Sequence, residues 1–190
     1  GEDPVTFVRT MKGVVFTEFL EMVEQKMSLA IVDQVLEKAK PGHGGTYTAV
    51  GTYPAEEMFA LVGALAEVTS TPAADLLFTF GEHLFGRFVV GYPAFFQGVK
   101  SPLEFLARVD SYIHIEVRKL YPDAELPRFE AQVVSDRELH LTYQSPRRLS
   151  ALARGLISGC GKHFGASLAV EQEDLSQGTG ERVLFRVTLA

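Results

Sequence analysis

Residues 101–122 read SPLEFLARVDSYIHIEVRKLYP, and residues 143–147 read YQSPR. The first stretch predicts one amphipathic helix, because its opening Ser-Pro supplies a capping residue followed by a proline at the first helical position. His114 shares a face of this helix with Asp110 and with apolar residues. Its imidazole is therefore expected to lie toward the core, screened from water.

The second stretch predicts an anion site. Tyr143 ends a predicted strand, and Ser145-Pro146 repeats the cap-and-proline signal, so a helix is predicted to begin there with Arg147 in its first turn. Two hydroxyls, a guanidinium and the free N–H groups of a helix N-terminus would then meet. The pattern Tyr-x-Ser-x-Arg is short, however, and an ordinary capped helix with a surface arginine also fits it.

His114 has two interpretations. A water-screened imidazole on a helix suits a haem iron, and the same placement suits a core histidine that makes one hydrogen bond. The weaker candidates are His43 in a glycine-rich loop, His83 on an apolar helix, His140 on a strand and His163 near a helix end. No grouping of His, Asp and Glu has the spacing of a zinc site.

Composition restricts the class of protein. The 190 residues are 46% hydrophobic, which is enough for a substantial core, and the net charge of −6 argues against nucleic-acid binding. No apolar run or leader predicts membrane insertion or export, so a cytoplasmic protein is expected. Cys160 is the single cysteine, which excludes an internal disulfide and covalent c-type haem. Met11 resembles a natural start, so residues 1–10 are interpreted as a tag or extension.

Hydrophobic periodicity predicts an α+β fold with a change of character near residue 125. A helical lobe at about 11–125 precedes an α+β lobe at about 126–190 with an antiparallel sheet, and together they form one domain. The predicted helices are 13–27, 29–39, 55–68, 73–90, 102–120 and 147–164. The predicted strands are 129–135, 138–144, 167–173 and 181–190, and residues 41–54 are predicted to form a loop.

One imidazole and one carboxylate-binding cluster together fit a haem, which carries an iron and two propionates. The chain resembles the H-NOX (haem–nitric oxide/oxygen binding, HNOB) family, related to the haem domain of soluble guanylate cyclase. The resemblance rests on His114 followed by Tyr-x-Ser-x-Arg, and on the segment HIEVRKLYPDAELP at 114–127. It also rests on MKGVVFTEFLEMVE from Met11 and GEHLFGRF at 81–88, and it extends from Met11 to the C-terminus.

This resemblance implies a non-covalent haem b held between the two lobes. His114 would be the proximal iron ligand, and Tyr143, Ser145 and Arg147 would bind the propionates. Pro127 matches a proline that presses on the porphyrin and bends it, which is one way in which a protein tunes haem.

The resemblance also indicates which gas binds. Family members that bind O2 use a distal tyrosine, helped by a tryptophan and an asparagine; these positions fall on Leu152, Phe19 and Leu84. A buried, partly anionic O2 needs a hydrogen-bond donor, whereas nitric oxide and CO depend on one much less. We therefore expect a sensor that binds nitric oxide and CO and excludes O2. The predicted apolar wall, which would also suit a plain core, is Val15, Phe19, Leu84, Phe85, Phe88, Leu152 and Leu156.

The expected signal is rupture of the iron–His114 bond, passed to a partner protein. By resemblance the partner is a sensor histidine kinase or a cyclic-di-GMP enzyme, and the sequence does not choose between them. No catalytic activity is expected. The alternatives are a haem enzyme of the peroxidase or nitric oxide dioxygenase type, which needs distal polar groups, and a haem-free interaction module with His114 in its core.

Overall fold

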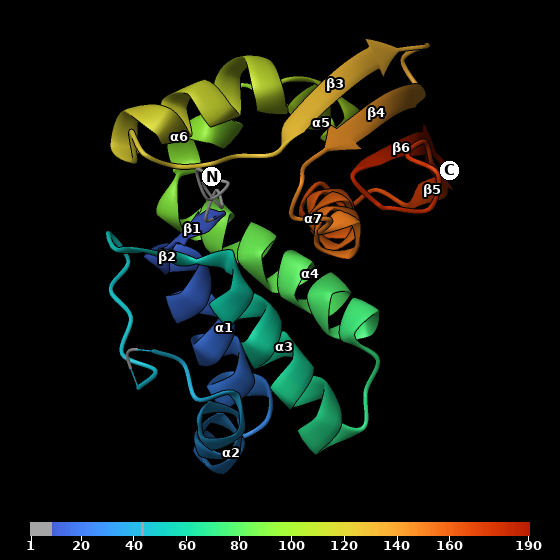
Figure 1. The fold of residues 1–190 in the computed structure, drawn as a ribbon. Coiled ribbons are helices and arrows are strands. Elements are labelled where there is room, and N and C mark those ends of the chain that lie inside the picture. The colour runs from blue at the N-terminus through green and yellow to red at the C-terminus, as the bar shows by residue number, and fades with distance from the viewer. Residues whose placement is uncertain (1–8, 43) are drawn as a thin grey trace, which may run out of the picture. The chain divides into compact units, whose positions relative to one another are not determined.

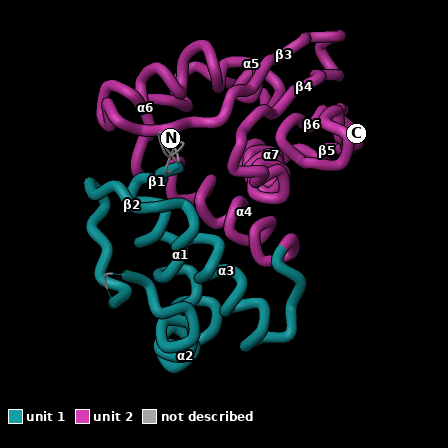
Figure 2. Tube along the Cα trace, viewed as in Figure 1, with its two compact units in different colours: residues 1–73 teal, residues 74–190 magenta. Residues whose placement is uncertain are grey.

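The computed structural model describes residues 9–42 and 44–190 (Figure 1). The chain forms two compact units, residues 1–73 and residues 74–190 (Figure 2). Among the described helices, none is by itself long and apolar enough to cross a membrane, although α3 (Ala55–Thr69) and α4 (Ala73–Gly91) pass that test as a bent pair. The mixture of helices with antiparallel sheet confirms the predicted α+β fold class.

The first unit contains three helices and a two-stranded sheet. Its elements are β1 (Thr10–Lys12), α1 (Gly13–Lys26), α2 (Leu29–Ala39), β2 (Thr52–Pro54) and α3 (Ala55–Thr69). The three helices confirm the helices predicted from apolar spacing at 13–27, 29–39 and 55–68. The prediction that residues 41–54 are loop throughout is wrong at its end, because β2 pairs with β1 there. Strands of three residues are too short to show an alternating pattern, and their pairing is non-local.

The second unit contains a four-stranded antiparallel sheet and several helices. Its helical elements are α4 (Ala73–Gly91), the 3₁₀ helix η1 (Pro93–Phe96), α5 (Pro102–Ala107), the π-helix η2 (Val109–Ile113), α6 (His114–Leu120) and α7 (Ser150–His163). Its strands are β3 (Arg128–Val133), β4 (Glu138–Gln144), β5 (Leu168–Asp174) and β6 (Arg182–Leu189). The spatial order is β3-β4-β6-β5, and all four predicted strands are confirmed.

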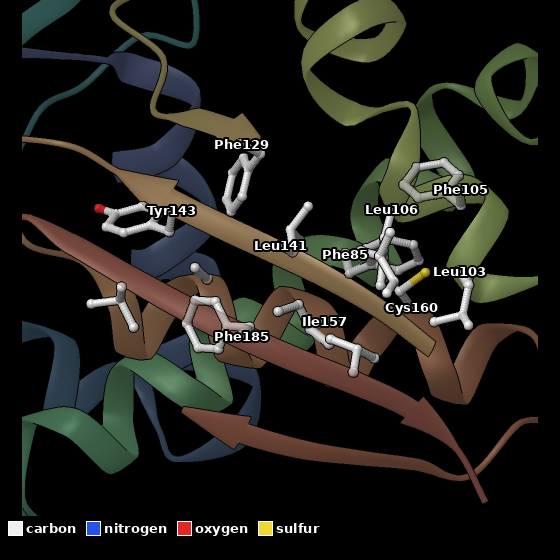
Figure 3. Close-up of a cluster of buried hydrophobic side chains, with 14 residues drawn as sticks. Phe85, Leu103, Phe105, Leu106, Phe129, Leu141, Tyr143, Ile157, Cys160 and Phe185 are labelled. Carbon is white, nitrogen blue, oxygen red and sulfur yellow. The ribbon is translucent and has the colours of Figure 1, made fainter. Parts of the chain in front are cut away.

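The core of this unit lies between one face of the sheet and the helices α5 and α7 (Figure 3). Alternate residues of β4 and β6, such as Leu141 and Phe185, are almost fully buried. They pack with Ile157 of α7 and Leu106 of α5. The alternation that predicts the strands therefore also selects the residues of the core.

Helices α4 and α7 meet through their backbones. A side chain at Gly155 would overlap the carbonyl oxygen of Phe78, and its Cβ would lie 2.9 Å from the Cα of Gly81. A side chain at Gly81 would in turn overlap the carbonyl oxygen of Leu152. This contact fixes the two helices at the closest separation that their main chains allow.

We predict that Gly155→Ala lowers the free energy of unfolding by about 1–3 kcal/mol, because the added methyl group overpacks this crossing. Urea denaturation measures the change. Gly86→Ala is the matched control: Gly86 lies on α4 with nothing within 4 Å of its would-be Cβ. That substitution should stabilise the helix by up to about 1 kcal/mol. Equal effects of the two substitutions would contradict the backbone contact.

Candidate functional site

His114 begins α6 directly after the π-helix η2. The N–H of Ile113 donates to the carbonyl of Arg108 at 3.2 Å, and the N–H of His114 donates to Val109, so both bonds span five residues. The prediction of one continuous helix from 102 to 120 is therefore wrong. The wider turn accommodates one extra residue, and the apolar spacing of three and four residues that predicts an α-helix does not reveal it. Single π turns are frequent at functional sites.

The His114 side chain is only 12% exposed. Its Nδ1 is buried and makes no hydrogen bond to any residue in the described ranges 9–42 and 44–190, although the Asp110 carboxylate Oδ1 is 3.7 Å away. Burial lowers the pKa of His114, and the Arg118 charge acts in the same direction; Asp110 and the Pro127 carbonyl oppose them. The neutral imidazole, which is the form that binds metals, is therefore favoured.

The predicted anion site has a different backbone from the one expected. The prediction of a helix from residue 147 is wrong, because α7 begins at Ser150 and Ser145 does not cap it. Residues 145–148 instead form a turn, in which Arg148 donates to the Ser145 carbonyl at 3.2 Å. Arg148 has φ of 57°, a left-handed conformation that an α-helix does not accept. The turn at 145–148 therefore does not form the helix N-terminus that was expected there.

The three predicted side chains nevertheless converge. Ser145 and Arg147 are 2% and 8% exposed, and the Ser145 Oγ accepts the N–H of Arg147 at 3.2 Å. The Tyr143 hydroxyl accepts the N–H of Leu149 at 2.9 Å. Burial raises the pKa of Tyr143, whereas hydrogen bonds from Ser145 and Leu149 and the charge of Arg147 lower it. The Ser145 hydroxyl and the Arg147 guanidinium thus lie close enough to the Tyr143 hydroxyl to change its pKa.

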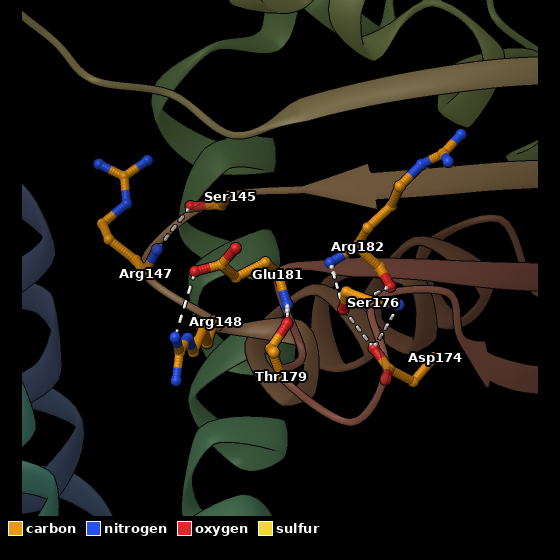
Figure 4. A network of polar contacts seen from close by, with 8 residues as sticks. All are labelled: Ser145, Arg147, Arg148, Asp174, Ser176, Thr179, Glu181 and Arg182. Carbon is orange, nitrogen blue, oxygen red and sulfur yellow. Dashed lines mark hydrogen bonds and ion pairs between the residues drawn. The ribbon is translucent and has the colours of Figure 1, made fainter.

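The two adjacent arginines differ in their surroundings. Arg148 is exposed and forms an ion pair with Glu181 at 3.2 Å, while the guanidinium of Arg147 points away from this pair (Figure 4). The Arg147 Nη1 lies 3.8 Å from Glu125. The alternative interpretation, a surface arginine on a capped helix, is therefore wrong, because Arg147 is buried and lies in a turn before α7. A buried guanidinium needs anionic partners, because an uncompensated buried charge is costly.

Phe129 joins the histidine to the anion site. Its ring centroid is 5.9 Å from that of His114 and 5.6 Å from that of Tyr143, its register partner on β4. Figure 3 shows the Phe129 and Tyr143 rings side by side. The structure therefore brings the two predicted sites together. Sequence reasoning missed Phe129, although its inward position opposite Tyr143 in the predicted hairpin could have indicated it.

Pro127 is half-buried and precedes β3 by one residue. Interaction with its backbone carbonyl raises the pKa of His114, so Pro127 lies beside the predicted iron ligand. This placement fits the predicted role of Pro127, and its contact with a porphyrin stays a prediction.

The residues of the predicted apolar wall occupy both units. In the first unit, Phe19 is fully buried on α1 and Val15 is half-buried. In the second unit, Leu84 and Phe85 are buried on α4, while Phe88, Leu152 and Leu156 are half-buried on α4 and α7. The Phe85 ring lies 5.6 Å from Phe96 and 5.4 Å from Phe105, within the aromatic core of the second unit.

The other histidines have different surroundings. His140 is half-buried, faces away from the core and lies 3.7 Å from Glu138, and His163 is exposed beside Phe96 and Phe164. His83 is half-buried on α4, and His43 lies outside the described residues. Within the described part of the chain, no group of three or more His, Cys, Asp or Glu could hold a metal ion.

The site fits a haem. Coordination of iron through Nε2 leaves the proton on Nδ1, which is the buried nitrogen that still needs an acceptor. The buried Arg147 and the hydroxyls of Tyr143 and Ser145 are the donor types that bind a carboxylate. The Phe129 ring therefore lies close both to the imidazole and to Tyr143 of the predicted anion site.

The comparisons with known proteins agree. A family model described as Haem-NO-binding (HNOB) matches residues 12–172. The Fe(II) unliganded H-NOX protein from K. algicida is 37% identical with a TM-score of 0.89, over 95% of this chain and 97% of that chain. An IWP-051-bound H-NOX from Shewanella woodyi in the Fe(II)CO state is 36% identical with a TM-score of 0.81, over 95% of each chain. An H-NOX protein from S. oneidensis in the Fe(II)NO state is 26% identical with a TM-score of 0.87, over 95% and 99%. A search of curated proteins gave no match.

The fold and the matches define a haem-binding domain of the α+β class. The chain belongs to the Haem-NO-binding family, also called H-NOX, whose members are gas-sensing domains.

We predict that Tyr143→Phe lowers the free energy of unfolding by about 1–3 kcal/mol, because the Leu149 N–H loses its acceptor in a buried position. Thermal or urea unfolding measures the change. Tyr112→Phe is the control, since it removes a hydroxyl and keeps the ring over which the Arg108 guanidinium lies. Similar losses for both variants would contradict a specific role of the Tyr143 hydroxyl at the start of α7.

Proposed function

We propose that this chain is a haem-based sensor of nitric oxide, in which His114 binds the iron of a non-covalent haem b. Tyr143, Ser145 and Arg147 would hold the propionates, with Pro127 beside the ring. The supporting observation is that the buried His114 imidazole, whose pKa is lowered by burial, and Tyr143 of the buried anion site both lie against the ring of Phe129. A bound ferrous haem would supply the iron that binds nitric oxide or CO, and His114 would hold that iron until the gas releases it.

Selectivity against O2 would come from the apolar side chains of the distal wall. Within the second unit, the side chains of Leu84, Phe88 and Leu152 have no hydrogen-bond donor to offer a bound gas. O2 gains partial negative charge on ferrous iron and is disfavoured without a donor, whereas nitric oxide and CO are affected much less. The Fe(II)NO and Fe(II)CO states named for the S. oneidensis and S. woodyi relatives support this choice of ligands.

Signalling would depend on whether α6 is tethered. His114 is the first residue of this seven-residue helix, and η2 separates it from α5. Release of His114 would free the start of α6 and the segment leading to Pro127. We propose that a partner protein in the cytoplasm, a sensor histidine kinase or a cyclic-di-GMP enzyme, reads this change, and that the domain itself is a sensor and not an enzyme.

Absorption spectroscopy of the purified, reduced protein tests the function. We expect a haem spectrum that changes on addition of nitric oxide or CO and that shows no stable oxygenated form in air. A colourless protein that takes up no added haem would contradict the cofactor. A stable oxygenated spectrum would contradict the selectivity.

The iron ligand is tested by substitution. His114→Gly should lose the wild-type spectrum and regain it with free imidazole. His140→Gly, which removes an imidazole from the outer face of the sheet, should behave as wild type. Retention of the native spectrum by His114→Gly would exclude this residue as the ligand.

A donor placed at position 152 should change the selectivity. Leu152→Tyr is expected to slow O2 dissociation from the ferrous protein by at least about tenfold, the effect of roughly 1.4 kcal/mol from one hydrogen bond. Stopped-flow spectroscopy measures this rate. Leu152→Phe adds a similar ring without a hydroxyl and should leave O2 binding unstable. Equal behaviour of the two variants would show that position 152 does not face the bound gas.

A further inference from the structure

We propose that Asp110 is a positioning residue for His114, and that its carboxylate couples the imidazole to strand β3. This inference deepens the proposed function and rests on it. Asp110 lies within the π-helix η2, four residues before His114, and its side chain is 30% exposed.

The carboxylate of Asp110 stands between two buried groups. Its Oδ1 accepts the backbone N–H of Phe129 at 3.2 Å, and the same oxygen lies 3.7 Å from the His114 Nδ1. That nitrogen is buried and makes no hydrogen bond within the residues described. The nearest charged acceptor is thus already held by the main chain of β3, just beyond hydrogen-bonding distance of the ring.

Strand β3 is an edge strand, which explains why its N–H is available. In the order β3-β4-β6-β5 it has one neighbouring strand. The backbone N–H and C=O groups of an edge strand point alternately toward that neighbour and away from the sheet. The Phe129 N–H is directed to Asp110, and η2 packs against β3. The carboxylate therefore replaces a missing strand partner and joins the helical segment to the sheet.

The chemistry of the imidazole gives this contact a role beyond a strand cap. A histidine that binds metal through Nε2 carries its proton on Nδ1, and the acceptor of that proton sets the ring orientation and the donor strength of the ligand. An ionised carboxylate has about four acceptor positions, so Asp110 can serve the Phe129 N–H and the His114 N–H together. A shift of about 0.5–1 Å brings the 3.7 Å separation into hydrogen-bonding range.

The geometry therefore couples movement of the imidazole to β3. Displacement of His114 changes its attraction to Asp110, and Asp110 transfers the change to the backbone of Phe129. The Phe129 ring also lies against both His114 and Tyr143. Strand β3 is therefore linked to His114 in two ways, through the backbone N–H of Phe129 and through its side chain.

The test compares Asp110→Leu and Asp110→Asn with a matched control in the full chain. Asparagine keeps an oxygen for the Phe129 N–H and loses the charge, whereas leucine removes both. Glu116→Gln is the control: it removes a carboxylate two residues from His114 that is ion-paired with Lys119 at 2.8 Å. Amide exchange across the sheet confirms that each variant is folded.

The first readout needs no haem. We expect Asp110→Leu to speed exchange of the Phe129 amide at least tenfold and to shift the His114 proton from Nδ1 toward Nε2 in ¹⁵N NMR spectra. Asp110→Asn should keep the amide protected and shift the proton less. If both variants leave the distribution of the His114 proton as in Glu116→Gln, Asp110 is only a strand cap and the proposal is wrong.

The second readout uses the reduced haem-loaded protein. We expect the iron–histidine stretching frequency in resonance Raman spectra to fall in Asp110→Leu, to fall less in Asp110→Asn, and to stay unchanged in Glu116→Gln. An unchanged frequency in both Asp110 variants overturns the proposal while leaving the haem assignment intact. Failure of the wild-type chain to bind haem overturns the proposed function instead, and the NMR readout still decides the role of Asp110.

Discussion

The antiparallel pairing of β3 with β4 is the constraint on which the site depends. It places Phe129 opposite Tyr143, and the inward ring of Phe129 then reaches His114. A slip of β3 by one residue would turn the Phe129 ring to the other face of the sheet, away from both Tyr143 and His114. Tyr143 itself is held on the inner face because β4 also pairs with β6, where Leu141 and Phe185 fill the core.

The electrostatics of the site follow from this arrangement. The sheet and the turn at 145–148 bury Arg147, which is 8% exposed, and the imidazole of His114 lies 5.9 Å from the ring of Phe129. Burial lowers the pKa of His114 and so favours the neutral imidazole, whereas arginine as a residue type keeps its charge in proteins. Under the proposed function, the same protein interior would offer the iron ligand and the cation that binds the propionates.

Much of this could be predicted from sequence, because helix and strand periodicities are local. The helices at 13–26, 29–39 and 55–69 and the hairpin at 128–144 follow from apolar spacing and turn residues. His114 and the Tyr143 cluster were recognisable because their side chains have unusual chemistry. The contact of Phe129 with both His114 and Tyr143 could not be recognised in the sequence, because a phenylalanine in a strand predicts a core position whatever its neighbours are.

The failures have physical causes. Ser145-Pro146 has the residue types of a helix cap, but the left-handed Arg148 delays α7 until Ser150. Side-chain identity at a cap does not determine the backbone conformation that follows it. The π turn before His114 is a one-residue insertion, which leaves the apolar pattern almost unchanged. Asp110 was visible on the face of His114, whereas its bond to Phe129 depends on tertiary packing.

The two helical regions of the second unit differ in how firmly they are held. Helices α4 and α7 contain 19 and 14 residues and meet through glycine backbones at Gly81 and Gly155. The segment around His114 consists of helices of six, five and seven residues with a π turn between the two α-helical pieces. Helices of this length are marginal alone, so their order depends on tertiary contacts. Because His114 begins the last of them, whatever the imidazole binds contributes directly to the order of α6, whereas the α4–α7 crossing has no comparable freedom to respond.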